Sequence, residues 1–324
     1  MTKIISLCAA ALISGFTVST PAAAQDWPQK NIRIVVAFGP GGGTDIIGRI
    51  LAEWMQEKLG KPVLIENRPG AGGTLGNELV ANAEADGYTL GIMTAGQIIA
   101  AVNKKDMRYD TLTAFAPIGQ VATANLLLVT RPDFAPNNVK ELVAAAQKDP
   151  GKITFASPGF GATQHFASEL FKQTAKLNML HVPFRTSGEA INAVLGKHAD
   201  LLIDTIPAVI GQVQGGQLKA LAVTGRDRFS VLPNVAPAIE SGVLPNYDVT
   251  TWYGFFAPKG TPALVVARLH KTLMDAIADE TVRKRLVAAG VAVKGSTPEE
   301  FGAFLAGEYK RWNGVREAAG IDRQ

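Results

Sequence analysis

Four glycines and one threonine gather in one short segment near the start of the chain, where their types and spacing suit anion binding. The segment runs from Phe38 to Asp45 and follows a largely apolar run that starts at Ile32. Free backbone N–H groups beside the positive end of a helix dipole favour a negatively charged ligand. A tight turn without a ligand is the alternative interpretation. The candidate ligand-binding residues here are Phe38, Pro40, Gly42, Gly43, Thr44 and Asp45.

Two nucleotide-binding motifs are incomplete in this segment, which narrows the choice of anion. The segment has no lysine followed by serine or threonine, so it is not a P-loop. Gly39, Gly41 and Thr44 do not complete the dinucleotide pattern, whose last glycine is missing. A carboxylate needs only a few N–H and O–H donors, so the segment favours a carboxylate over a nucleotide.

The same order of residue types recurs in the middle of the chain. The run Ile153 to Ala156 predicts a strand, Ser157 to Gly161 a glycine loop, and Ala162 to Leu170 a helix. Two strand–loop–helix units predict two domains, each of which offers a helix N-terminus to a shared cleft. The candidate residues of this second unit are Ser157, Gly161, Ala162 and Thr163.

Four further polar residues lie at predicted strand ends or in loops. Thr94 and Gln97 follow a strand at the edge where α/β clefts open, and Gln97 could reach the far end of a ligand. Arg185 is either a bidentate partner for a second carboxylate or a solvated loop residue. Asp204 either accepts a hydrogen bond from a ligand hydroxyl or amine, or caps a helix.

Neither a catalytic set nor a metal site is predicted. Ser157 is not the nucleophile of a hydrolase elbow, because Phe155 stands where that motif has its first glycine. His165 and Glu169 lie one helical turn apart. No further histidine or cysteine has ligand spacing, so a packed core histidine is favoured over a metal ligand. His165 stays among the candidate ligand-binding residues, and no cofactor is expected.

Composition and the N-terminal segment predict an exported two-domain protein. The chain has 324 residues, of which 47% are hydrophobic and 19% charged, so it can bury a sizeable core. Lys3, an apolar stretch and the alanines before Gln25 predict a signal peptide over 1–24, cleaved after about Ala24, and a periplasmic location. Cys8, the only cysteine, lies in that signal. The basic residues are scattered, so nucleic acid is not an expected partner.

Predicted strands and helices alternate through the chain, which is typical of an α/β protein whose parallel sheet is covered by helices. The first predicted helix begins near Ile46 after a Thr44 or Asp45 cap, and Thr74 is expected to cap the next. Two segments near the C-terminus, Pro262 to Ala289 and Pro298 to Ala319, read as surface helices. The predicted strands after the first are Val63 to Ile65, Tyr88 to Thr94, Ala116 to Thr130, Ile153 to Ala156, Met179 to Phe184, Ala199 to Asp204, Leu218 to Thr224 and Asn246 to Phe256.

The order and spacing of several motifs resemble the Bug/TctC family, the periplasmic solute-binding proteins of tripartite tricarboxylate transporters. The likeness covers nearly the whole chain after the signal. The residues that carry it include Trp27-Pro28, Pro40-Gly-Gly-Gly-Thr-Asp45, Arg49, Glu66-Asn-Arg-Pro-Gly-Ala-Gly-Gly73, Asp86-Gly-Tyr-Thr89, Ser157-Pro-Gly-Phe-Gly161, His165, His181-Val-Pro-Phe184, Glu240-Ser-Gly242, Trp252 and Ala257-Pro-Lys-Gly-Thr-Pro262.

This resemblance implies a two-domain Venus-flytrap fold of the periplasmic-binding-protein type, with a sheet and flanking helices in each domain and the ligand cleft between them. Domain 1 would be 25–125 plus 246–324, and domain 2 would be 126–245, with crossings near Asn125 and Tyr247. The implied function is capture of a small organic carboxylate by domain closure, by a monomer that delivers it to membrane permease subunits. An exported hydrolase-like enzyme and a carboxylate sensor for a signalling partner are the alternatives.

Three departures from the family pattern leave the identity of the ligand open. Ala37 stands where proline is common, Ala162 where serine or threonine usually follows the loop, and Phe184-Arg-Thr-Ser-Gly188 where Tyr-Lys-Gly is usual. The last change removes a phenol and adds the Arg185 guanidinium. A di- or tricarboxylate fits the pattern, and so does an aromatic carboxylate, given Phe38, Phe160 and Trp252.

Overall fold

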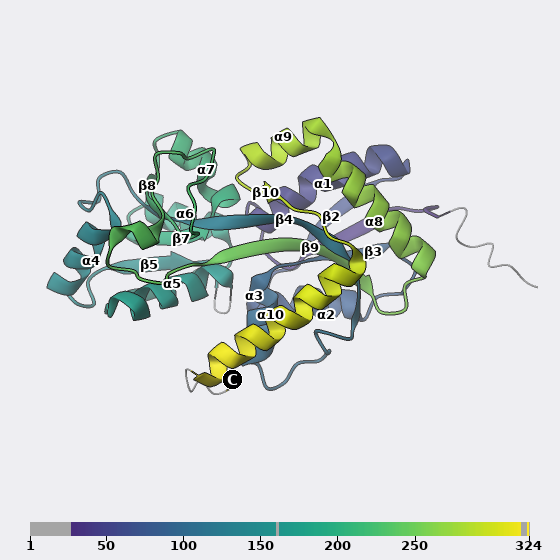
Figure 1. Cartoon of the computed structure of the whole chain (residues 1–324), viewed down its shortest axis with the longest axis horizontal. Helices are drawn as coiled ribbons and strands as arrows, with labels where there is room; N and C mark the ends of the chain where they lie inside the picture. Colours follow the sequence, from purple (N-terminus) through teal and green to yellow (C-terminus); the bar gives the residue numbers. More distant parts are fainter. Residues whose placement is uncertain (1–26, 160–161, 319–322, 324) are drawn as a thin grey trace, which may run out of the picture.

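Two lobes lie side by side along the long axis of the molecule, joined by two long strands (Figure 1). The computed structural model describes residues 27–159, 162–318 and 323. The joining strands are β4 (Phe115–Thr130) and β9 (Thr250–Pro258), which pair antiparallel. Across the whole sheet the strand order is β2-β1-β3-β9-β4-β7-β5-β6, and β8 and β10 also pair with β4. Each lobe therefore shares one continuous sheet with the other.

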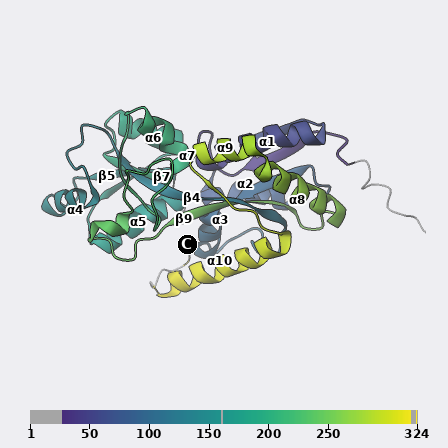
Figure 2. The same ribbon diagram turned by 45° about the horizontal axis from the view of Figure 1, so that its top comes forward.

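The first lobe holds the N-terminal strands and the C-terminal helices. Strand β1 pairs parallel with β2 and β3, and β3 pairs antiparallel with β9. Helices α1, α8 and α9 cover one face of this sheet, and α2, α3 and α10 cover the other (Figures 1 and 2). Its other elements are β1 (Ile32–Val36), α1 (Gly43–Leu59), β2 (Val63–Asn67), a 3-10 turn (Ala71–Gly73), α2 (Thr74–Ala81), β3 (Thr89–Met93), α3 (Ala95–Asn103), α8 (Ala263–Ala278), α9 (Glu280–Ala288), β10 (Ala292–Val293) and α10 (Pro298–Ala318).

The second lobe is built in the same way from the middle of the chain. Strand β5 pairs parallel with β6 and β7, while β7 and β8 pair antiparallel with β4. Helices α4 and α5 pack on one face, and α6 and α7 pack on the other. Its elements are α4 (Val139–Lys148), β5 (Thr154–Ser157), α5 (Thr163–Ala175), β6 (Leu180–Pro183), α6 (Ser187–Leu195), β7 (Leu201–Thr205), α7 (Ile206–Gln214), β8 (Lys219–Val223) and a 3-10 turn (Ala238–Ser241).

The chain passes between the lobes within β4 and just before β9. Strand β4 pairs with β9 as far as Asn125 and with β7 from Leu126 onward, so the first crossing lies where the sequence predicts it. Tyr247 packs in the second-lobe core, where its hydroxyl donates to the carbonyl oxygen of Ala167 at 2.9 Å. Pairing of β9 with β4 begins at Thr250, so the second crossing follows Tyr247 by a few residues. The exact domain bounds stay a prediction.

Most expected elements form, and the differences have local causes. The sheet is mixed and not wholly parallel, because the crossing strands run antiparallel to their neighbours. Helix α1 begins at Gly43 after a Gly42 N-cap, so a Thr44 or Asp45 cap and a start near Ile46 are wrong. Likewise Thr74 is the first residue of α2 and not its cap. The segment from Pro262 to Ala289 forms two helices, because the Asp279 side chain accepts N–H bonds that start α9.

The structure bears on membrane-spanning helices but not on the predicted signal peptide. The predicted signal peptide over 1–24 lies outside the described residues. Among the residues that the structure describes, no helix combines the length and the apolar character needed to cross a bilayer.

Candidate ligand-binding site

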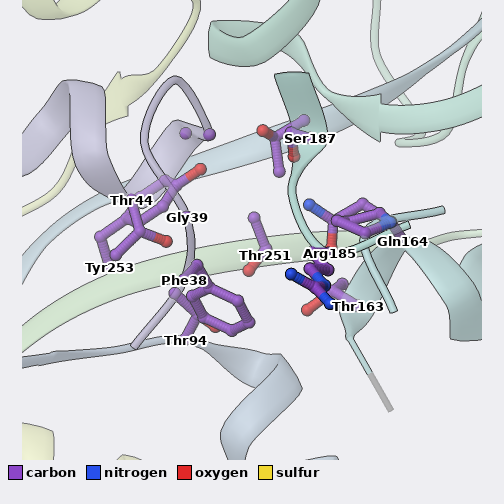
Figure 3. A pocket seen from close by; sticks show the side chains of 14 residues that line it. Phe38, Gly39, Thr44, Thr94, Thr163, Gln164, Arg185, Ser187, Thr251 and Tyr253 are labelled. Carbon is purple, nitrogen blue, oxygen red and sulfur yellow. The ribbon is translucent and has the colours of Figure 1, made fainter. Parts of the chain in front are cut away.

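A small pocket lies between the two lobes, at the ends of their strands (Figure 3). The cavity is small, with a volume of about 30 Å³. Thr251 on the crossing strand β9 lies between the two walls in Figure 3. The lining residues are Phe38, Gly39, Gly42, Gly43, Thr44, Thr94, Pro158, Thr163, Gln164, Arg185, Ser187, Thr205, Thr251 and Tyr253.

In the described part of the chain, five helices begin at this pocket. Helices α1 and α3 come from the first lobe, and α5, α6 and α7 come from the second. The pocket-lining residues at their starts are Gly43 in α1, the N-cap Thr94 of α3, Thr163 in α5, Ser187 in α6 and the N-cap Thr205 of α7. The first N–H groups of a helix have no intrahelical partner, and the helix dipole places partial positive charge there. The convergence of these ends creates a site for a negative charge.

Charged side chains strengthen this polarity only at the mouth of the pocket. Arg185 lines the pocket and is exposed, and its side chain lies close to Thr163 in Figure 3. Among the lining residues that the structure describes, none is acidic. The pocket therefore combines backbone donors inside with a guanidinium at its edge.

Asp45 stabilises the first glycine loop through hydrogen bonds and does not line the pocket. Its carboxylate accepts hydrogen bonds from the Gly41 N–H, the Asn67 amide and the Arg49 guanidinium, each at 3.0 Å. Burial alone would raise the pKa of Asp45, but these hydrogen bonds outweigh it and lower the pKa. Asn67 also donates to the carbonyl oxygen of Phe38, so the loop is tied to β2 at two points. The local ion pair with Arg49, the simpler interpretation of these two residues, is present.

Gln97 holds the start of α3 and does not reach into the pocket. Its side-chain oxygen accepts from the backbone N–H of Thr94 and from the Thr94 hydroxyl, which forms a capping box. Its amide nitrogen donates to the carbonyl oxygen of Ile92 at 3.0 Å, and the residue is fully buried. Thr94 does line the pocket, so the structure separates these two candidates.

Asp204 lies behind the second-lobe wall, in contact with residues that line it. Its Oδ1 accepts from the Gln164 amide at 2.8 Å and from the Thr205 N–H at 2.7 Å, while its Oδ2 is buried with no hydrogen bond of good geometry from any residue that the structure describes. Burial raises the pKa of this carboxyl group, opposed by hydrogen bonds from Gln164, Ser187 and Thr205. The carboxylate thus links the starts of α5 and α7.

The second glycine loop is anchored by a histidine that was not among the predicted site residues. The Ser157 hydroxyl lies 2.7 Å from His181 Nε2, and the ring of His181 stacks between those of Phe155 and His165 at 4.7 and 4.5 Å. Burial, followed by the neighbouring His165, lowers the pKa of His181 to about 4. Burial also lowers the pKa of His165. Neither Ser157 nor His165 lines the pocket, so both act from behind it.

The remaining predicted residues divide between the wall and its support. Thr163, Arg185, Phe38, Thr44 and the glycines Gly42 and Gly43 line the pocket, whereas Pro40 does not. Ala162 is the N-cap of α5 and makes no side-chain capping bond. Gly161 lies outside the described residues.

Several lining residues were missed by the sequence analysis, and two of them are polar residues that lie two positions apart on one strand. Thr251 and Tyr253 are two residues apart on β9, so their side chains point to the same face. Both hydroxyl groups are buried, and neither has a hydrogen-bond partner of good geometry among the described residues. Polar residues that alternate in an otherwise apolar strand were the available signal. The missed lining residues are Gly39, Pro158, Gln164, Ser187, Thr205, Thr251 and Tyr253.

The two-lobed α/β architecture with a pocket between the lobes is that of the periplasmic binding proteins. The solved structure of the periplasmic binding protein BugD is similar, with a TM-score of 0.88 and 36% identity over 92% of this chain and 100% of that one. The Rpa4515 protein of R. palustris, solved with adipate, has a TM-score of 0.87 and 30% identity over 92% and 99% of the two chains. These similarities confirm the predicted fold class.

The sequence comparisons identify the family. Residues 47–321 match the model of the tripartite tricarboxylate transporter family receptor, TctC. A UPF0065 protein from the tcbD-tcbE intergenic region of Pseudomonas sp. (strain P51) is 37% identical over 297 residues, which are 91% of this chain and 88% of that protein. The chain belongs to the TctC family of solute-binding receptors, as the motif resemblance predicts.

Proposed function

We propose that this protein is a periplasmic receptor that binds a small organic carboxylate between its lobes. The observation that carries this proposal is the convergence of five helix N-termini on one pocket whose described lining residues include no acid. The proposal is supported by the adipate found with the similar Rpa4515 protein. A carboxylate placed here would accept hydrogen bonds from both lobes at once, so its binding favours the closed arrangement of the lobes.

The expected affinity follows from the number of hydrogen bonds to the anion. A hydrogen bond to a charged group contributes roughly 1.5–3 kcal/mol. About three such bonds, together with the helix dipoles, reach the roughly 8 kcal/mol that corresponds to a micromolar dissociation constant.

Arg185 suggests that the ligand carries a second carboxylate. Its guanidinium is exposed at the pocket mouth, and no hydrogen bond or ion pair of this group is seen in the described part of the chain. A guanidinium binds a carboxylate through two parallel N–H···O bonds, which makes the pairing geometrically selective. A short dicarboxylate would place one end among the helix N-termini and the other at Arg185.

Binding without chemical change is favoured over hydrolysis. The contact between the Ser157 hydroxyl and His181 resembles a nucleophile with a base. Ser157, however, is fully buried and absent from the pocket wall, so it cannot reach a ligand held there. We infer that the protein releases its ligand unchanged, as a monomer, to membrane permease subunits of a tripartite tricarboxylate-type transporter, and not to a signalling partner.

A panel of acids tests the binding proposal. Adipate, malate, citrate and benzoate would be screened by thermal shift and then by calorimetry, with adipamide as the uncharged control of the same carbon skeleton. We expect at least one acid to bind with micromolar affinity and the diamide to be inactive. Equal binding of the diamide, or no bound acid, would contradict the proposal. NMR spectra of the mixture should show the acid unaltered. Signals of a new product would instead support the alternative function, a hydrolase-like enzyme.

Delivery to a permease is a separate measurement. Vesicles that contain the transporter's membrane subunits should accumulate the labelled acid only when the loaded receptor is added. Equal uptake without the receptor would contradict the transport role and favour the sensor.

A further inference from the structure

Three contacts of one kind join the lobes around the pocket. In each, a glycine of the first lobe faces the threonine at the start of a second-lobe helix: Gly39 faces Thr186, Gly43 faces Thr205 and Gly96 faces Thr163. Thr186 is the N-cap of α6, Thr205 is the N-cap of α7, and Thr163 is the first residue of α5. All three helices that the second lobe directs at the pocket therefore meet a glycine of the first lobe.

While the lobes are together, a side chain at Gly39 or Gly43 would overlap a neighbouring side chain, and one at Gly96 would require its neighbour to shift by a few tenths of an ångström. A Cβ atom on Gly39 would lie 2.1 Å from Cγ2 and 2.7 Å from Cβ of Thr186. A Cβ atom on Gly96 would lie 3.1 Å from both the backbone nitrogen and the hydroxyl of Thr163. On Gly43 it would lie 2.6 Å from the Thr205 hydroxyl and 2.5 Å from that of Tyr253.

The local backbone gives no reason for glycine at these positions. None of the three has a positive φ, in contrast to Gly41 in the same loop, whose φ is 79°. An alanine would therefore be compatible with the conformation of each segment taken alone. What excludes a larger residue at Gly39 and Gly96 is the opposite lobe.

The threonine opposite Gly39 cannot easily move aside. The Thr186 hydroxyl accepts the Glu189 N–H at 3.1 Å as the N-terminal cap of α6, which fixes the side-chain rotamer. Opposite Gly96, the nearest atoms include backbone, which cannot shift without moving the start of α5. Additional atoms at either glycine would be accommodated by separation of the lobes.

We propose that Gly39 and Gly96, with Gly43 between them, are positioning residues of the binding site. Their missing side chains let the helix N-termini of the second lobe approach those of the first closely enough to hold one anion from both sides. This inference rests on the proposed carboxylate binding and adds what sets the spacing of its donors. The glycines act on closure, so their substitution weakens binding without unfolding either lobe.

Substitutions that differ only in the space available test this idea. Gly39→Ala should weaken adipate and malate binding by more than tenfold. It should also prevent the decrease in the radius of gyration that we expect small-angle scattering to show when ligand is added to the unaltered protein. Gly96→Ala, with its longer contact, should weaken binding a few-fold. Gly211→Ala in α7, which meets nothing within 4 Å, should bind as the unaltered protein does. The ligand-free melting temperature should change little in all three.

Removal of the facing side chain should reverse the effect. In G39A/T186G the two atoms that would lie too close to the added methyl group are gone, and the nearest remaining atom is the Cα of residue 186, at an ordinary 3.5 Å. Glycine also replaces an N-cap residue at a cost of only a few tenths of a kcal/mol. The double variant should regain most of the affinity lost in Gly39→Ala. Unchanged affinity in Gly39→Ala, or no recovery in the double variant, would overturn the proposal.

A cross-linking experiment tests this inference separately from the proposed function, because disulfide formation between the lobes needs no ligand. A Cβ on Gly42 would lie 3.8 Å from Cβ of Ser187, a spacing suited to a disulfide across the closed lobes. Oxidation should therefore cross-link a Gly42→Cys, Ser187→Cys variant, faster in the Gly211→Ala background than in the Gly39→Ala background. Equal rates would refute the positioning role even if no acid binds, whereas failure of every acid to bind refutes only the proposed function.

Discussion

Asp204 is a buried carboxylate that is held by neutral donors. Its Oδ2 has no hydrogen bond of good geometry from the described residues, and burial raises its pKa above the ordinary value of 3.8. The native protein therefore keeps this proton to a higher pH than the unfolded chain, and native stability falls as the pH rises through 3.8 toward the raised pKa. Asp204→Asn keeps an acceptor for Gln164 and Thr205 and removes the charge.

We expect Asp204→Asn to change the pH dependence of stability more than the stability in acid. At pH 7 the variant should gain about 1–3 kcal/mol relative to the unaltered protein, because an uncompensated buried charge is gone. At pH 4 the two should be closer. Urea unfolding at both pH values measures the difference, and parallel pH profiles would contradict the assignment.

Tyr253 and Tyr247 are both buried, but only one has a partner for its hydroxyl. Within the described residues, the Tyr253 hydroxyl lines the pocket beside the Thr205 hydroxyl but has no hydrogen bond of good geometry, whereas the Tyr247 hydroxyl donates to the carbonyl oxygen of Ala167. Tyr253→Phe should leave the ligand-free stability unchanged or slightly higher and weaken acid binding about 3- to 10-fold, the value of one hydrogen bond. Tyr247→Phe should do the reverse, with lower stability and unchanged affinity. Calorimetry and urea unfolding of both variants check this prediction. A loss of stability in Tyr253→Phe would show that the Tyr253 hydroxyl makes a hydrogen bond in the ligand-free protein.

At the scale of elements, the first glycine loop depends on a residue beneath it. The Asp45 carboxylate accepts hydrogen bonds from the Gly41 N–H and from the Asn67 amide. Asp45→Ala removes both bonds, so the loop before α1 loses its ties to the helix and to β2. We expect acid binding to weaken about 5- to 10-fold without unfolding, since two or so hydrogen bonds that order the loop are lost. Arg49→Gln keeps both bonds and should have a smaller effect. Similar affinities for the two variants, measured by calorimetry, would remove Asp45 from the support of the site.

The elements were more predictable than the side chains that meet at the pocket. Strand β5 and the start of α5 lie within one residue of their predicted positions, because their signals are local. The glycine loops were found for the same reason. Ser187 and Tyr253 were not predicted to line the pocket, because only the crossing strands and the packing of two lobes bring them to one place.

At the scale of the whole molecule, an aromatic contact joins the lobes away from the pocket. Phe166 on α5 of the second lobe packs against the first-lobe core, with its ring 6.0 Å from that of Trp312 on α10 in an edge-on arrangement. Figure 2 shows α10 along the underside of the first lobe. Because α5 also begins at the pocket with Thr163, one helix carries both a pocket-lining residue and an aromatic contact between the lobes.

The Phe166 contact should therefore contribute to affinity from a distance. An aromatic pair is worth about 0.5–1.5 kcal/mol beyond its buried area, and separation of the lobes would expose it. Phe166→Ala should weaken acid binding about 3- to 10-fold and reduce the ligand-induced compaction in small-angle scattering. Leu170→Ala, on the same helix but exposed, is the matched control and should change neither. If Phe166→Ala binds the acid as tightly as Leu170→Ala does, closure does not depend on this contact, and the glycine–threonine contacts at the pocket must hold the lobes together without it.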